Sequence, residues 1–265
     1  MASRRLFIAL LLVCSAASSV QAACVPLRFG YIDQHRPPYY MGEGTAVPDP
    51  AGATVDLIRD AVMGSGFGCL PQLVRLPPAR LRLALISGDI DMTIIGEMAS
   101  YPPEIALPRD KSGEVDGNRA LHNKLIVLVR ASDKLPATTN PMSYFKGKVL
   151  GAGQGNAFAA RLREQGLTID DGARDVERNI EKLKLHRFDG VIVGAVKPGH
   201  IEAVLKRYHG EIVQLQVPLV DTKLWLGFNQ NYYQAHREQA ESLWNWIDQH
   251  RSHLGYVIEK YRKAN

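Results

Sequence analysis

The stretch from Leu81 to Glu97 reads LRLALISGDIDMTIIGE, and a similar stretch, IEKLKLHRFDGVIVGAV, runs from Ile180 to Val196. In each copy a leucine-bearing helical run gives way to an Asp, and an apolar run then ends in glycine five residues later, at Gly96 and Gly194. Such an apolar run is typical of a buried parallel strand, and the preceding helix covers one of its faces. Two such units predict two similar α/β lobes whose strand ends face each other across a cleft. The alternative is a chance recurrence of helix, turn and strand.

The first 22 residues have the features of a secretory signal peptide. Arg4 and Arg5 precede the apolar run LFIALLLVC, and Val20-Gln21-Ala22 supplies a small-residue cleavage site. This run is too short to span a bilayer, and no later stretch approaches the ~20 apolar residues of a transmembrane helix. The whole chain is 46% hydrophobic, which is enough for one large or two modest cores. We therefore expect a globular mature protein outside the cytoplasm.

Removal of the signal peptide takes away Cys14 and leaves Cys24 and Cys69. Two cysteines in an oxidising compartment most simply pair, and closing this loop is worth roughly 3 to 4 kcal/mol in the chain-entropy model. Two free thiols with a catalytic or metal role are the weaker alternative, because no CxxC or Cys/His cluster accompanies them. Neither Cys14 nor Cys24 follows a good lipid-attachment box, so a lipid anchor is not favoured.

Charge and short motifs exclude several classes of function. The net charge of +5 is mild and evenly spread, which does not indicate a nucleic-acid partner. The sequence contains no HExxH pair and no GxSxG elbow, and GAGQG lacks the G-x-G-x-x-G spacing of a dinucleotide loop. His250 and His253 stand three residues apart without a third ligand, so we expect surface residues there. We expect no metal and no cofactor.

Two apolar runs, His122 to Arg130 and Asp221 to Asn229, are expected to be strands that carry the chain out of the first lobe and back into it. The first lobe is then discontinuous, with residues 23–122 plus 222–265, and the second lobe comprises residues 123–221. Two crossing strands between α/β lobes predict a hinge.

Several motifs together resemble the family 3 extracellular solute-binding proteins, a periplasmic group that includes the amino-acid receptors of ABC transporters. In chain order, between Leu27 and Tyr261, they are LRFGY, GATVDLIRDAV, LxxGDIDMTIIG, KGKVLGAGQG, FDGVIVG and WNWIDQHRSHLGYVIEKY. The resemblance implies a two-lobed periplasmic-binding-protein-like fold of type II, in which two βα lobes are joined by a two-strand hinge and close on a ligand.

The chain departs from the family pattern at the ligand anchors. Amino-acid binders usually follow the first glycine-ended strand with a Thr and, three residues on, an Arg for the ligand carboxylate. Here Ser100 stands for the Thr, but the Arg position falls near Pro103. The Asp that usually holds the ligand ammonium is replaced by Gly194. We therefore do not expect a standard α-amino acid, and Arg75 and Arg80 are candidates to replace the missing positive charge.

The site candidates follow strand ends or precede a helix. Tyr39 and Tyr40 come after Pro-Pro, where the family places an aromatic wall, although one of them is equally suited to cap the core. Glu97 is suited to a cationic ligand, or is merely solvated. The turn before the helix at Ala157 is suited to an anion or a carbonyl. Trp225 is expected to be a packed hinge residue. The expected ligand-binding residues are Tyr39, Tyr40, Gly96, Glu97, Ser100, Gly155, Asn156 and Gly194.

These expectations favour a monomeric periplasmic solute-binding protein that is not an enzyme. It would deliver a small polar solute to an ABC-type permease or report it to a membrane sensor. The alternative is a periplasmic enzyme on the same scaffold, resembling dehydratases, with Glu97 as the carboxylic acid of the cleft.

Overall fold

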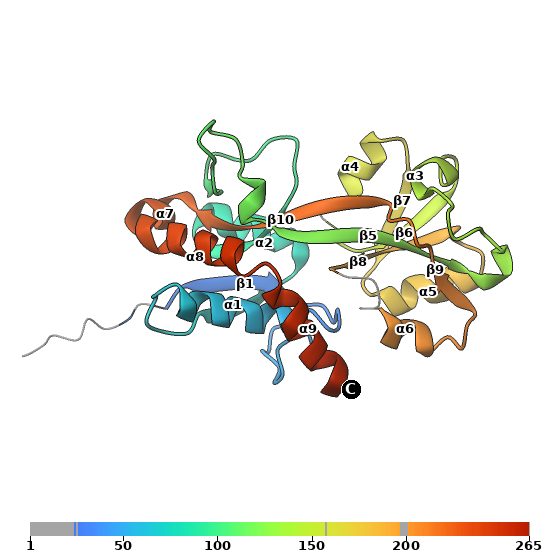
Figure 1. Cartoon of the computed structure of the whole chain (residues 1–265), viewed down its shortest axis with the longest axis horizontal. Helices are drawn as coiled ribbons and strands as arrows, with labels where there is room; N and C mark the ends of the chain where they lie inside the picture. Colours follow the sequence, from blue (N-terminus) through green and yellow to red (C-terminus); the bar gives the residue numbers. More distant parts are fainter. Residues whose placement is uncertain (1–23, 25, 157, 197–200, 265) are drawn as a thin grey trace, which may run out of the picture.

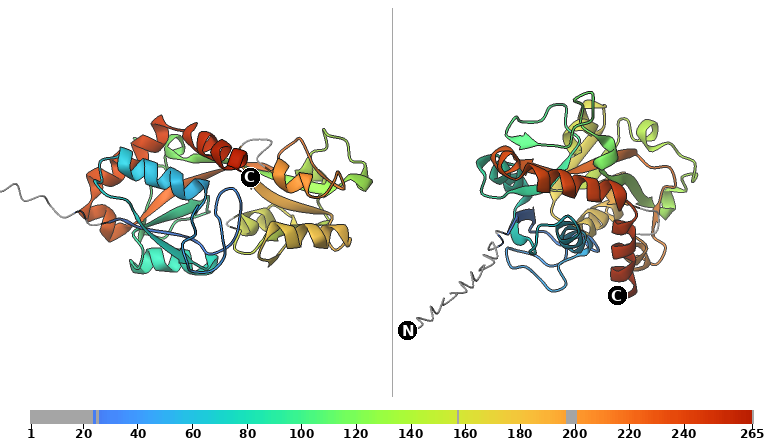
Figure 2. Two further views of the ribbon diagram at one scale, coloured as in Figure 1. Left: turned by 90° about the horizontal axis from the view of Figure 1, so that it is seen from below. Right: turned by 60° about the vertical axis from the view of Figure 1, so that its left-hand side comes forward.

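The computed structural model describes residues 24, 26–156, 158–196 and 201–264. The expected signal peptide, residues 1–22, lies outside the described residues. The described chain forms two α/β lobes side by side, connected by two long strands (Figures 1 and 2). This arrangement confirms the predicted fold class. No helix of the described residues combines the length and the apolarity that crossing a membrane requires.

The first lobe combines the amino-terminal βα units with the carboxyl-terminal helices. Leu57, Ile58 and Val62 place the apolar face of α1 in a core that also buries Phe228 and Trp244. The terminal helices α8 and α9 pack against α1 (Figure 2). The elements of this lobe are β1 (Arg28–Ile32), α1 (Ala53–Gly64), β2 (Gln72–Leu76), α2 (Pro78–Ser87), β3 (Met92–Gly96), β4 (Ile105–Ala106), α7 (Gln230–Ala235), α8 (Arg237–Gln249) and α9 (His253–Ala264).

The second lobe is built by the central part of the chain. Within the described residues, the helix that precedes β9 extends over Glu202–Lys206. The segment 131–147 holds a 3-10 helix over Ala131–Asp133 and one short α-helix. At the start of this α-helix Asn140 accepts from the Ser143 N–H and Pro141 begins the first turn. The elements are α3 (Pro141–Tyr144), β6 (Val149–Gly153), α4 (Ala159–Glu164), β7 (Thr168–Ala173), α5 (Val176–Lys184), β8 (Gly190–Ala195), α6 (Glu202–Lys206) and β9 (Ile212–Gln214).

Strands β5 (Leu121–Arg130) and β10 (Val220–Asn229) cross between the lobes. Their first halves pair with each other, from Leu121↔Leu224 to Leu125↔Val220. Beyond that pairing β5 continues alongside β8 and β9, whereas β10 continues alongside β3 and β4. The hydrogen-bonded order is therefore β2-β1-β3-β10-β5-β8-β6-β7, and within the described residues the ladder passes from one lobe to the other through these two strands.

The repeated Asp has the same structural role in both lobes. Asp91 Oδ2 accepts a hydrogen bond from the Arg28 N–H at the start of β1, at 2.8 Å. Asp189 Oδ2 accepts one from the Val149 N–H at the start of β6, at 2.7 Å. In each lobe the carboxylate satisfies a strand-end N–H that the sheet leaves unpaired. The sequence repeat is thus a repeat of architecture, α2 with β3 and α5 with β8.

Cys24 and Cys69 form a disulfide, as the cysteine count predicts. The bond ties the chain before β1 to the loop before β2. Strand β2 begins at Gln72, directly after Pro71, which has no N–H to donate to a neighbouring strand.

Candidate functional site

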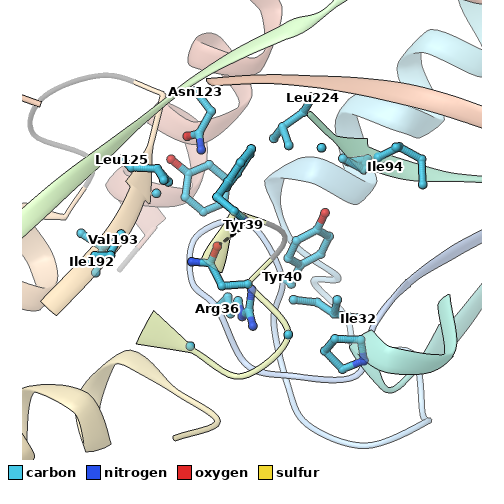
Figure 3. Close-up of a pocket in the computed structure, with 18 of the residues that line it drawn as sticks. Ile32, Arg36, Tyr39, Tyr40, Ile94, Asn123, Leu125, Ile192, Val193 and Leu224 are labelled. Carbon is cyan, nitrogen blue, oxygen red and sulfur yellow. Dashed lines mark hydrogen bonds between the residues drawn. The ribbon is translucent and has the colours of Figure 1, made fainter. Parts of the chain in front are cut away.

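A cleft of about 1010 Å³ lies between the lobes, at the carboxyl ends of β1, β3, β6 and β8. Gly96 ends β3, and Gly194 is the second-last residue of β8, which continues to Ala195. The two glycines lie on the two sides of the crossing strands, where Gly96 pairs with Leu224 and Gly194 with Leu125. Both glycines line the cleft. Figure 3 shows Leu125, Ile192 and Val193 on one side of the cavity and Ile32, Tyr40 and Ile94 on the other.

The loop after β1 supplies an aromatic wall. The Arg36 N–H donates to Tyr40 O at 2.8 Å and the Tyr40 N–H to Arg36 O at 2.9 Å, so the Pro-Pro segment folds back on itself. Tyr40 stacks on Tyr31 with ring centroids 5.9 Å apart. Tyr39 reaches the second lobe, where its hydroxyl accepts a hydrogen bond from the Val196 N–H at 3.1 Å.

Burial raises the pKa of Tyr39 and of Tyr40 to about 12. The hydrogen bond from the Val196 N–H opposes the rise in the pKa of Tyr39. A hydrogen bond with the Thr54 side chain opposes the rise in the pKa of Tyr40. Both phenols are therefore neutral at neutral pH and offer an apolar face and a hydroxyl to the cleft.

Seven of the eight expected ligand-binding residues line the cleft, namely Tyr39, Tyr40, Gly96, Glu97, Gly155, Asn156 and Gly194. Ser100 is exposed and lies outside this lining. The Oδ1 atom of Asn156 accepts from the Phe158 N–H at 2.9 Å and so supports its own turn. The helix expected from Ala157 begins at Ala159 and has six residues.

Glu97 is paired with a residue of the other lobe. Its Oε2 atom lies 2.6 Å from Nη1 of Arg161 in α4. The sequence offers no signal for this partner, because Arg161 is one of several charged residues on an exposed helix. The pair leaves Glu97 less suited to the cationic ligand that its sequence position suggested.

Further contacts join the lobes across the cleft. Arg36 Nη2 donates to the Gln154 carbonyl oxygen at 2.8 Å, and Arg174 Nη2 lies 3.9 Å from Asp33 Oδ1. Gly155 has a φ of +70°, and a Cβ placed on it would meet the Cβ of Pro78, at the start of α2, at 2.4 Å. The lobes are therefore in contact at the mouth of the cleft, and the described conformation is a closed one.

The two arginines expected to replace the missing anchor do not line the cleft. Arg75 is buried and donates to the carbonyl oxygens of Ala46 at 2.7 Å and Gly42 at 2.6 Å, so it supports the loop after β1. Arg80 is exposed on α2. Arg36, from the segment that ends the first strand, lines the cavity instead (Figure 3), as do Arg82, Arg161 and Arg174.

Trp225 is packed, as expected for a hinge residue. Only 4% of it is exposed, its Nε1 donates to Asp116 O at 2.9 Å, and its ring meets Tyr101 edge-on at 6.4 Å. It also borders the cleft. Within the described ranges, no three His, Cys, Asp or Glu residues lie close enough to hold a metal ion.

No family model matches the sequence, and no curated protein matches it. Solved structures do match. The GluR0 ligand-binding core from Nostoc punctiforme in complex with L-glutamate aligns with a TM-score of 0.63 at 17% identity, over 89% of this chain and 99% of that one.

An amino acid ABC transporter substrate-binding protein, AbpA from Streptococcus pneumoniae bound to L-arginine, has a TM-score of 0.62 at 13% identity, over 90% of this chain and 95% of its own. The BvgS VFT2 domain of Bordetella pertussis has a TM-score of 0.62 at 11% identity, over 89% of this chain and 93% of that one. At such identities the likeness concerns the fold. The chain has the two-lobed fold of the family 3 solute-binding proteins, the fold that its motifs predict.

Proposed function

We propose that this protein is a periplasmic solute-binding protein that captures a small polar solute between its lobes, for an ABC-type transporter or a membrane sensor. The observation that carries the proposal is the cleft of about 1010 Å³, because its walls come from both lobes and meet at their edges. A solute held there contacts both lobes only when they are together. Its binding free energy therefore favours the closed form.

The crossing strands provide a suitable hinge. In the part of the chain that the structure describes, β5 and β10 are the strands that continue the sheet from one lobe to the other, so rotation about their shared segment would leave both cores intact. We propose that residues 23–122 with 222–265 move as one body and residues 123–221 as the other. A membrane partner that recognises the closed form would then distinguish the loaded protein from the empty one.

The solute proposed is not a standard α-amino acid. Two of the similar structures are complexes with L-glutamate and L-arginine. In this chain Pro103 is exposed and outside the cleft lining, and Gly194 carries no charge. The two ionic anchors that the family resemblance implies are thus lacking at the positions where they are expected.

An enzyme on this scaffold would need a carboxylic acid that keeps its proton in the cleft. Glu97, the candidate for that role, forms an ion pair with Arg161, and a neighbouring guanidinium favours the ionised carboxylate. No arrangement of the described residues favours the enzyme over the binding protein.

The test is a thermal-shift screen of residues 23–265 against amino acids, polyamines, organic acids and small peptides. A ligand that binds the native state alone raises the melting temperature in a saturable way, by about 2.7 kcal/mol of stability at 100 times its Kd. Each hit is then measured by small-angle X-ray scattering, where closure lowers the radius of gyration. Saturable stabilisation without chemical conversion supports the proposal, whereas turnover of a hit, or no hit in any class, contradicts it.

A further inference from the structure

The charged side chains of the cleft have an excess of positive charge. Its lining holds four arginines, Arg36, Arg82, Arg161 and Arg174, and two glutamates, Glu97 and Glu164. Glu97 is paired with Arg161, and Glu164 is exposed at the end of α4. Beside Gly194, where an ammonium anchor is expected, lies the neutral amide of Asn123.

Arg36 differs from the other three because it lies farther inside. Arg82, Arg161 and Arg174 are exposed, whereas Arg36 is partly buried between the aromatic wall and the second lobe (Figure 3). Its Nη2 donates to Gln34 Oε1 at 2.5 Å and to Gln154 O at 2.8 Å. Among the described residues, the Nε and Nη1 atoms of Arg36 have no hydrogen-bond acceptor, and no carboxylate lies within ion-pair distance of the guanidinium.

The surroundings of this guanidinium are unfavourable to its charge. Burial lowers the pKa of Arg36, and the electrostatic interaction with Tyr40 opposes that shift. A desolvated cation without a counter-ion is costly, and an anion that offers two oxygens to Nε and Nη1 compensates that cost. Geometry and charge therefore point to an anionic group in front of Arg36.

Most of the remaining inner wall is apolar, and its polar groups are the neutral side chains of Thr54, Thr93, Asn123 and Asn179. The apolar walls would hold the body of a ligand whose charged end lies at Arg36, and a hydrocarbon or aromatic body gains free energy by leaving water for such walls. The side chains that form them are Ile32, Tyr39, Tyr40, Ile94, Leu125, Phe158, Ile192, Val193 and Leu224.

We infer that the cleft binds an amphipathic carboxylate without an ammonium group, with the carboxylate on Nε and Nη1 of Arg36 and an aromatic or aliphatic body against the apolar walls. This inference rests on the proposed function and names the chemical class of its solute. An ammonium group would bring a second charge into walls whose inner part presents no free carboxylate to it.

The test compares four probes that share one phenyl body and differ in charge. They are 3-phenylpropionate, neutral 3-phenylpropionamide, L-phenylalanine and 3-phenylpropylamine, each titrated into the disulfide-intact protein by calorimetry. A charge-assisted bidentate contact exceeds a neutral one by roughly 10- to 100-fold in Kd, so we expect that preference for the propionate over the amide. The zwitterion and the amine should bind more weakly than the propionate.

The variant Arg36→Gln removes the charge, and Arg80→Gln removes an equal charge from an exposed position outside the cleft. Because Arg36 also contacts Gln154, its loss is expected to weaken closure around every probe. The readout is therefore the ratio of propionate to amide Kd, which a general loss of closure leaves unchanged. We expect this ratio to approach one in Arg36→Gln and to stay at the wild-type value in Arg80→Gln.

Three outcomes overturn the inference. The wild type binds the amine or the zwitterion at least as tightly as the propionate, or Arg36→Gln keeps the wild-type ratio, or no phenyl probe binds. If one of them occurs while the broad screen yields another saturable ligand, the solute class is wrong and the proposed function stands. If the broad screen also yields none, the proposed function fails too. The wild-type comparison of the four probes decides the question even where Arg36→Gln does not fold.

Discussion

A single methyl group added at Gly155 should oppose closure of the lobes by more than it lowers the stability of the fold. A Cβ at residue 155 would lie 2.4 Å from the Cβ of Pro78, whereas ordinary contact begins at 3.4 Å, so the lobes must part there by about 1 Å. Neither the pyrrolidine ring of Pro78 nor the backbone of Gly155 can turn aside as a long side chain does. Overpacking of this kind costs about 1 to 3 kcal/mol, and the cost applies to the closed form alone.

The change Gly155→Ala should therefore weaken solute binding by roughly 5- to 150-fold. Its positive φ adds backbone strain of about 1 kcal/mol in the open and the closed form alike, which lowers the melting temperature without changing Kd. Gly166→Ala is the matched control, because Gly166 has a φ of +86° and open space around its Cβ position.

The measurements are calorimetric Kd values for a solute found in the screen and the melting temperatures of the free proteins. Both variants should melt earlier than the wild type by similar amounts, and Gly155→Ala alone should lose affinity. Adding Pro78→Gly removes the opposing Cβ and should restore most of that affinity. Equal Kd values for Gly155→Ala and Gly166→Ala, or no rescue by Pro78→Gly, would show that this contact does not limit closure.

Three further results are expected. Replacing Cys24 and Cys69 by Ala should lower the free energy of unfolding in urea by about 4 kcal/mol, which is the loop-entropy value for a sequence separation of 45. A decrease of less than about 1 kcal/mol would contradict this prediction. A double-mutant cycle of Glu97→Ala and Arg161→Ala, measured on the Kd of a solute, should give a coupling free energy of about 0.5 kcal/mol, because the ion pair is partly exposed. This coupling should disappear in ~1 M salt, and a coupling that does not depend on salt would indicate packing instead. Burial raises the pKa of Tyr40 to about 12 in the folded protein, whereas the pKa of an unfolded tyrosine is about 10. Below pH ~10 the phenol is protonated in the folded and the unfolded protein, and between pH ~10 and ~12 it ionises in the unfolded protein alone. Stability should fall on the order of 2 kcal/mol more over that interval in the wild type than in Tyr40→Phe, and identical pH profiles would refute the buried phenol.

Charge arrangement in the cleft also bears on transport. In the proposed function, a solute held by the guanidinium of Arg36 and apolar walls would leave the protein when the lobes separate, because water would then replace the counter-ion. Affinity and release would then depend on the same rotation about β5 and β10. That rotation would also break the contacts between the lobes, Glu97 with Arg161 and Arg36 with Gln154.

Sequence pattern was sufficient for the elements whose cause is local. The apolar runs around Met92 and Val191 predict strands because they need cover on both faces, and the structure contains β3 and β8 there. Pairing of the repeated Asp with a strand-end N–H was not foreseen, since the partner residues Arg28 and Val149 lie 63 and 40 residues away. The α/β topology expected from the sequence placed Gly96 and Gly194 at a common cleft, and both glycines line the cleft of the structure.

Composition, periodicity and the order of motifs thus established two α/β lobes, two crossing strands and one disulfide, because each follows from residues that are neighbours in the chain or from a simple count. The partners inside the cleft follow from folding and closure. Arg36 meets the carbonyl of Gln154 across 118 residues, and Arg161 meets Glu97 across 64, so no spacing rule pairs them. Arg75 shows the converse, because its place near a strand end suggested a ligand anchor and the fold uses it to support a loop. Charge at a binding site depends on which side chains are buried together, and that is a property of the packed lobes.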